Sequence, residues 1–111
     1  GKGRGVRDMV ATEAGFLLLA GPDDDPSHQK GDWTVAWWDG QSIASKTLAT
    51  LDLRGVEPRK LEPGGPRACK DAKRAKPEAI TVLEEAPQFY RLLVLSDGMC
   101  DGGALEFVIK R

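Results

Sequence analysis

The chain has 111 residues, 41% of them hydrophobic, and its 16 lysines and arginines nearly balance its 17 aspartates and glutamates. This length suits one domain with a modest core. A formal net charge of −1 excludes the broad basic field that attracts nucleic acids or membrane surfaces, and the longest apolar run, Phe16–Ala20, is too short to cross a bilayer. We therefore expect neither a nucleic-acid partner nor a membrane.

Strand patterns dominate the chain, because short apolar runs are bounded by turns rich in Gly, Pro and Asp. In the third of these runs, alternation places Trp33, Val35 and Trp37 on one face. In the fourth, alternation places Leu48 on the face opposite Ala49. We expect seven strands, in chain order Val6–Ala11, Phe16–Ala20, Trp33–Trp38, Ser45–Leu53, Glu78–Leu83, Tyr90–Leu95 and Leu105–Ile109.

Residues 54–76 interrupt the strand pattern with prolines, glycines and a cluster of lysines and arginines. This composition predicts an insertion or linker, within which Ala68–Ala75 favours a short helix. The basic cluster contains no aromatic residue for stacking on bases, so we expect a solvated surface and not a nucleic-acid interface.

The second half of the chain repeats the first in the order of its features. Asp8-Met9-Val10 aligns with Glu78-Ala79-Ile80, and Leu17–Leu19 aligns with Leu92–Val94. Each unit resembles a propeller blade, although the second lacks a fourth strand. We expect a mainly β fold of antiparallel, four-stranded, blade-like sheets, amounting to one to two blades of a β-propeller; a small β-sandwich formed by self-association is the alternative. The units are residues 1–53 (first blade), 54–76 (insertion) and 77–111 (partial second blade).

Several motifs are shared with a known family: Arg4-Gly5-Val6-Arg7-Asp8-Met9, Gly15–Pro22, Trp38-Asp39-Gly40, Lys76-Pro77-Glu78-Ala79-Ile80 and Leu93–Gly98. In their order they resemble the C-terminal portion of the bacterial family called domain of unknown function 3616. That family is similar in pattern to esterase-like phytases and sugar-lactone hydrolases. The resemblance implies a β-propeller, and it implies that the chain is a fragment of a longer parent protein.

Acidic residues open the first strand of each unit, and the innermost strand of a propeller blade lines the central channel. Asp8, Glu78 and Asp97 are therefore candidate ligands for Ca²⁺, which prefers several oxygen donors. Arg7 is a candidate for holding an anionic substrate. In the alternative interpretation, these acids accept hydrogen bonds from backbone amides and Arg7 pairs with one of them.

The chain contains two cysteines, Cys69 and Cys100, and a single histidine, His28, which are too few for a structural zinc site. The cysteines form either a disulfide or two small, partly buried thiols. A disulfide would indicate the periplasm or the cell exterior.

Two functions follow from this reading. In the first, the chain is a binding or assembly segment, whose partners are the remainder of a longer parent chain or further copies of the protein, since fewer than two blades leave sheet edges to be covered. In the second, it is part of a phytase-like or lactonase-like hydrolase that uses a channel cation. The second predicts a loss of thermal stability with a chelator, and the first does not.

Overall fold

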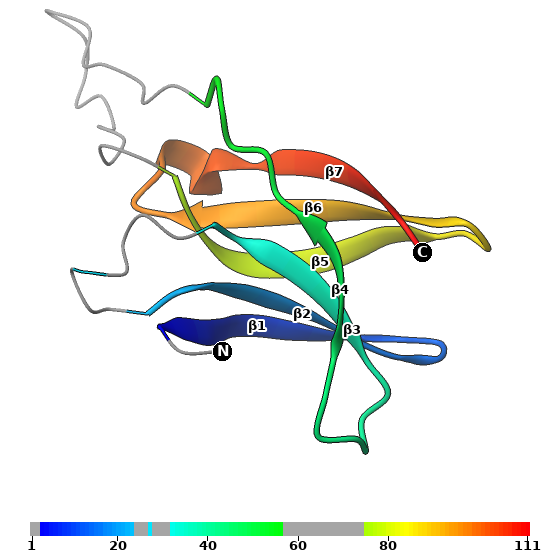
Figure 1. Cartoon of the computed structure of the whole chain (residues 1–111). Coiled ribbons are helices and arrows are strands. Elements are labelled where there is room, and N and C mark those ends of the chain that lie inside the picture. The colour runs from blue at the N-terminus through cyan, green and yellow to red at the C-terminus, as the bar shows by residue number, and fades with distance from the viewer. Residues whose placement is uncertain (1–2, 24–26, 28–31, 57–74) are drawn as a thin grey trace, which may run out of the picture.

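The computed structural model contains two antiparallel β-sheets (Figure 1). It describes residues 3–23, 27, 32–56 and 75–111. A short 3₁₀ segment, η2 (Cys100–Gly103), precedes the last strand. The strands are β1 (Arg4–Thr12), β2 (Gly15–Pro22), β3 (Thr34–Trp38), β4 (Lys46–Thr50), β5 (Lys76–Glu85), β6 (Phe89–Asp97) and β7 (Leu105–Lys110).

Each strand pairs with the next one along the chain, so both sheets are simple meanders. The first sheet has the order β1-β2-β3-β4 and the second has the order β5-β6-β7. The mainly β, blade-like architecture predicted from the sequence is confirmed, with strand ends that differ from the predicted ones by at most three residues. Most of the insertion expected at residues 54–76 lies outside the described residues, as do Cys69 and nearly all of the helix expected at 68–75.

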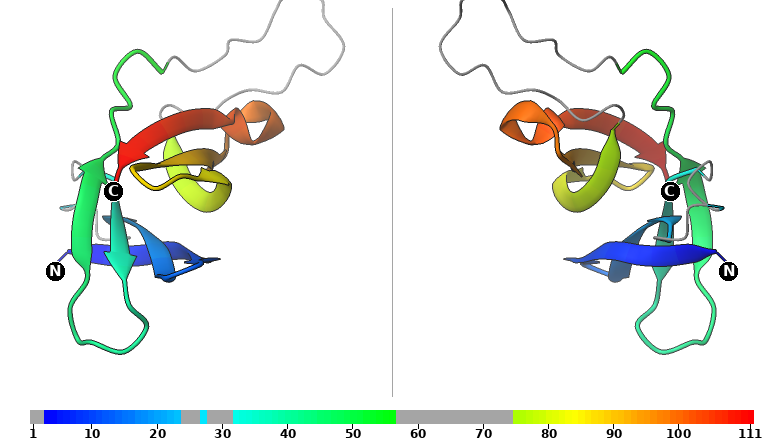
Figure 2. Two further views of the ribbon diagram at one scale, coloured as in Figure 1. Left: turned by 90° about the vertical axis from the view of Figure 1, so that its right-hand side faces the viewer. Right: turned by 90° about the vertical axis from the view of Figure 1, so that its left-hand side faces the viewer.

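The two sheets meet along their first strands, β1 and β5, which run side by side (Figures 1 and 2). The backbone N–H of Ile80 donates to Asp8 Oδ2 over 2.9 Å, and the backbone N–H of Glu13 donates to Glu85 Oε2 over 3.1 Å. Both links join residues 72 positions apart. The strands β1 and β5 are therefore parallel and keep a constant register. The second sheet repeats the orientation of the first, and the two sheets are not related by a two-fold axis.

One hydrophobic core fills the space between the sheets. The strand β2 contributes Leu17 and Leu19, and β6 contributes Leu92 and Val94, all with no exposed surface. Trp33 and Val35 are buried on the same side, and Trp37 packs against them, as the alternation predicted. The buried members are Leu17, Leu19, Trp33, Val35, Leu51, Ile80, Tyr90, Leu92, Val94 and Ile109.

Two β-bulges correct the repeat that was aligned from the sequence. In β1 the bulge falls at Arg7, between the paired positions Val6 and Asp8. In β5 it falls at Glu78, between Pro77 and Ala79. Arg7 thus corresponds to Glu78, and Asp8 corresponds to Ala79. The predicted equivalence of Asp8 and Glu78 is therefore wrong by one residue. Because successive side chains of a strand point to opposite faces, that slip exchanges the two faces of the sheet.

With the register corrected, the two sheets present the same faces in the same direction. Leu19 pairs with Asp8, directly after the β1 bulge, and Leu95 pairs with Ala79, directly after the β5 bulge. Leu19 is buried against the second sheet, whereas its counterpart Leu95 is 37% exposed on the far side of the molecule. The sheets are stacked front to back.

Another bulge explains why the predicted pattern of β4 is wrong. The register between β3 and β4 shifts between Val35 and Ala36, which pair with Ala49 and Thr47. Leu48 is the extra residue, and it packs against the core together with Ala49. Regular alternation would have placed these two side chains on opposite faces.

Candidate functional site

Asp8, a predicted calcium ligand, lies on β1 and connects the two sheets. Its Oδ2 accepts the hydrogen bond from Ile80, and its Oδ1 accepts one from the backbone N–H of Met9 over 2.8 Å. Both oxygens are therefore engaged with backbone amides. This is the structural role that the alternative interpretation assigned to the carboxylates.

Arg7 and Glu78, the two bulge residues, face one another across the joint between the sheets. Arg7 Nη1 lies 3.7 Å from Glu78 Oε1, and Arg7 also donates to the carbonyl of Pro22. The side chains are 21% and 36% exposed, so solvent screens the pair and limits its contribution to at most about 1 kcal/mol. An anion bound at Arg7 would compete with both of these partners.

Asp97, at the end of β6, lines a shallow groove that also contains Arg7, Glu78 and Ser96. Within the described part of the chain, no group of three His, Cys, Asp or Glu side chains is close enough together to hold a metal ion. Asp8, Glu78 and Asp97 therefore do not converge on one point. Calcium binding stays a prediction without support from this geometry.

Cys100 opens η2 and is 3% exposed. It is disulfide-bonded and not a free thiol. The other cysteine of the chain, Cys69, lies outside the described residues, so the compartment expected from a disulfide stays a prediction.

Two carboxylates whose pKa values are lowered lie in turns, away from these candidate sites. Hydrogen bonds from the backbone N–H groups of Ser42 and Gln41 lower the pKa of Asp39, directly after β3. Paired with the guanidinium of Arg54, Asp52 has a pKa lowered to about 2. Both carboxylates are exposed, so they order turns and are not candidates for catalysis.

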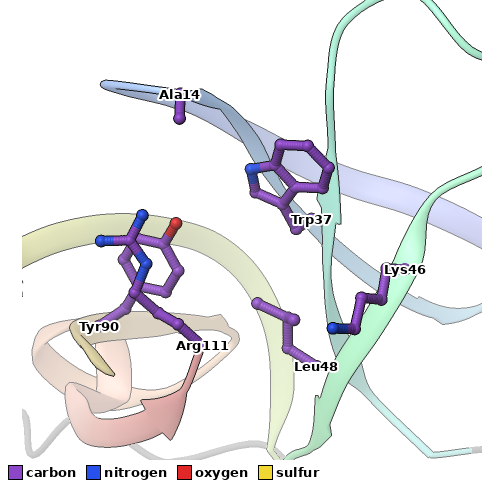
Figure 3. Close-up of a pocket in the computed structure, with 6 residues that line it drawn as sticks. All are labelled: Ala14, Trp37, Lys46, Leu48, Tyr90 and Arg111. Atoms are coloured by element: carbon purple, nitrogen blue, oxygen red, sulfur yellow. The ribbon is translucent and has the colours of Figure 1, made fainter. Parts of the chain in front are cut away.

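A pocket opens between the sheets, at the end where the β1–β2 turn lies (Figure 3). Its volume is about 240 Å³, and most of its surface is apolar. The first sheet and its turns supply four side chains and the second sheet supplies two. They are Ala14, Trp37, Lys46 and Leu48, and opposite them Tyr90 and Arg111.

Two local features hold the aromatic side chains of this pocket in place. Gly15 allows Trp37 to pack on the β1–β2 turn, because a Cβ at Gly15 would lie 3.0 Å from Trp37 Nε1 and 2.5 Å from the Trp38 carbonyl oxygen. On the other side, the guanidinium carbon of Arg111 lies 4.6 Å from the centre of the Tyr90 ring, within the range of a cation–π contact. Arg111 is fixed further by a 2.6 Å hydrogen bond to the carbonyl of Ala86.

This pocket was not predicted from the sequence. Its lining residues are spread from position 14 to position 111 and come together only when the sheets stack. The sole available signal was Trp37, whose strand pattern was read as a core position, and which contributes to both the core and the pocket.

The outer face of the first sheet is a second notable surface. It exposes large apolar side chains, with Val6 61%, Met9 49% and Ile43 fully exposed. These residues, together with Leu18 and Trp38, line a shallow apolar groove. Phe16 packs on Trp38 at the same face, with ring centroids 5.6 Å apart.

In the part of the chain that the structure describes, no helix is long and apolar enough to cross a membrane. Comparison of the chain with protein-family models, curated proteins and solved structures finds no match. The resemblance noted in the sequence therefore stays a prediction, and the geometry of these surfaces is what bears on function.

Proposed function

We propose that the chain is an assembly segment of a propeller-like array, and that its function is to bind further blade-like sheets on its outer faces. The observation that carries this proposal is the apolar outer face of the first sheet, with Val6, Met9 and Ile43 exposed. Contiguous exposed apolar surface of this kind marks interaction sites in folded proteins.

The repeat of the two sheets indicates what would cover that face. Between the sheets, the forward side of the first, carrying Leu19, packs on the rear side of the second, carrying Leu92 and Val94. The rear side of the first sheet, with Leu18 and Met9, is the counterpart of the packed rear side of the second. None of the residues that the structure describes forms a layer over it. A sheet presenting its forward side would complete it.

In the isolated protein, a second copy supplies that sheet. The forward side of the second sheet exposes Leu95 (37%) and Val108 (66%), and it would dock on the rear side of the first sheet of the next copy. Such a contact is heterologous, because different faces meet, and it leads to rings or open stacks. The remainder of a longer parent chain would use the same two faces.

Sedimentation velocity over a range of concentrations tests this proposal. We expect species larger than the 12.0 kDa monomer, and we expect Met9→Glu and Val108→Glu each to abolish them. At concentrations where the wild type is monomeric, thermal melting of both variants should match that of the wild type. A mixture of the two variants should form a dimer, because each retains one intact face. Gln88→Glu, in the exposed β5–β6 turn, is the matched control and should associate normally.

Other outcomes would overturn the proposal in different ways. A wild-type chain that stays monomeric at all concentrations would exclude assembly through these faces. Association that survives in Val108→Glu but not in Met9→Glu would indicate a two-fold contact between first sheets, and the small sandwich formed by self-association would then be the better description.

A further inference from the structure

The pocket between the two sheets carries an inference that does not depend on assembly. It combines a cavity of about 240 Å³, aromatic and aliphatic walls, and two cationic side chains at its rim. None of the described residues that line it is acidic. We propose that this pocket binds a flat aromatic carboxylate, with the ring between Trp37 and Leu48, beside the Tyr90–Arg111 pair, and the anionic group toward Lys46 and Arg111.

The cations account for the anionic group of the ligand. Lys46 is exposed, and it forms no ion pair with any described residue. Figure 3 shows its ammonium group turned toward Leu48. Arg111 is held in place on the Tyr90 ring by its bond to the Ala86 carbonyl, which leaves guanidinium donors for a carboxylate.

The aromatic walls account for the ring of the ligand. Ligand sites are typically apolar clefts with a few convergent polar groups. The Nε1–H groups of Trp33 and Trp38 donate to the carbonyls of Pro77 and Ser42 over 3.0 and 2.8 Å. Trp37 Nε1 has no hydrogen-bond partner among the residues that the structure describes, so its N–H is available at the pocket.

This difference among the three tryptophans provides the test. Each indole N–H gives its own cross-peak in a ¹⁵N–¹H correlation spectrum, and 2-naphthoate is the probe. We expect 2-naphthoate to shift the Trp37 indole peak while Trp33 and Trp38 stay in place, with a dissociation constant of about 1 mM or lower for a ligand of this size. The neutral alcohol 2-naphthalenemethanol carries the same ring and should bind more weakly.

Variants separate the charge contribution from packing. Lys46→Met and Arg111→Met retain much of the apolar side chain, and each should weaken naphthoate binding about two- to fivefold, as expected for a partly exposed ion pair. Lys110→Met is the matched control, because Lys110 is an exposed cation on β7 that does not line the pocket; it should bind as the wild type does. Binding of the neutral alcohol should not change in Lys46→Met.

Three results would overturn the inference. The first is a shift of the Trp38 indole peak instead of the Trp37 peak, which would place the probe on the outer face. The second is equal affinity for the acid and the alcohol. The third is an equal loss of naphthoate affinity in Lys46→Met and Lys110→Met. The last would show only a general effect of net charge.

Discussion

At the scale of single residues, a glycine makes room for the tryptophan ring that reaches from the first sheet to the second. Gly21 lies against the Trp33 ring, where an added Cβ would be 2.5 Å from Nε1 and 2.7 Å from Cδ1. Trp33 is 8% exposed, and its Nε1–H donates to the Pro77 carbonyl on the other sheet. A side chain at position 21 therefore acts on the core and on an inter-sheet hydrogen bond together.

We expect Gly21→Ala to reduce the free energy of unfolding by about 1–3 kcal/mol, since overpacking must displace the Trp33 ring. Urea unfolding followed by tryptophan fluorescence measures the loss. Gly5 is the matched control, because it pairs with Gly21 across the same hairpin and has open space around its Cβ position. Gly5→Ala should be neutral or slightly stabilising; equal losses in both variants would show that strand geometry and not the Trp33 contact is responsible.

At the scale of elements, the sequence predicted every strand but not the register of the repeat. The strands are short apolar runs with clear turn signals, and these local features are legible in the chain. A bulge inserts one residue without a strong local signal, and Arg7, Glu78 and Leu48 each occupy such a position. Because the bulges at Arg7 and Glu78 were not predicted, the two halves were aligned one residue out of register. Asp8 and Glu78 were therefore wrongly taken as equivalent positions.

The joint between β1 and β5 allows a direct test of the two roles considered for the acidic residues. Asp8→Ala removes the acceptor of the partly buried backbone N–H of Ile80. We expect this variant to lower the free energy of unfolding by about 1–3 kcal/mol. Asp97 is exposed at the end of β6, and Asp97→Ala should change little. Chelation by EDTA should not alter thermal melting of the wild type.

The calcium hypothesis predicts a different pattern in the same measurements. A cation held by Asp8, Glu78 and Asp97 would raise the melting temperature on addition of Ca²⁺, because a ligand of the native state stabilises it by mass action. Asp8→Ala and Asp97→Ala would then both abolish that rise. Such a result would favour the alternative, in which the chain is part of a hydrolase with a channel cation.

At the scale of the whole molecule, the fold class was predictable and the pocket was not. Composition and strand patterning determine a mainly β architecture, and the order of features in each half predicted two blade-like sheets. The pocket depends on how the sheets stack, which brings Trp37 within reach of Tyr90 and Arg111. Sequence patterning describes faces of single strands, and it contains little information on which distant faces meet.

The shared core also means that the two sheets should unfold together. All three tryptophans lie in or beside the first sheet, whereas Leu92 is a fully buried residue of the second. Leu92→Ala should cost about 2–5 kcal/mol through the lost apolar contact and the cavity left behind. The tryptophan fluorescence of the first sheet should report this loss in full, in a single transition that coincides with circular dichroism. Val108→Ala, at a 66% exposed position of the same sheet, should have little effect. Tryptophan melting that ignores Leu92→Ala would show that the sheets are separate folding units, each needing its own covering layer.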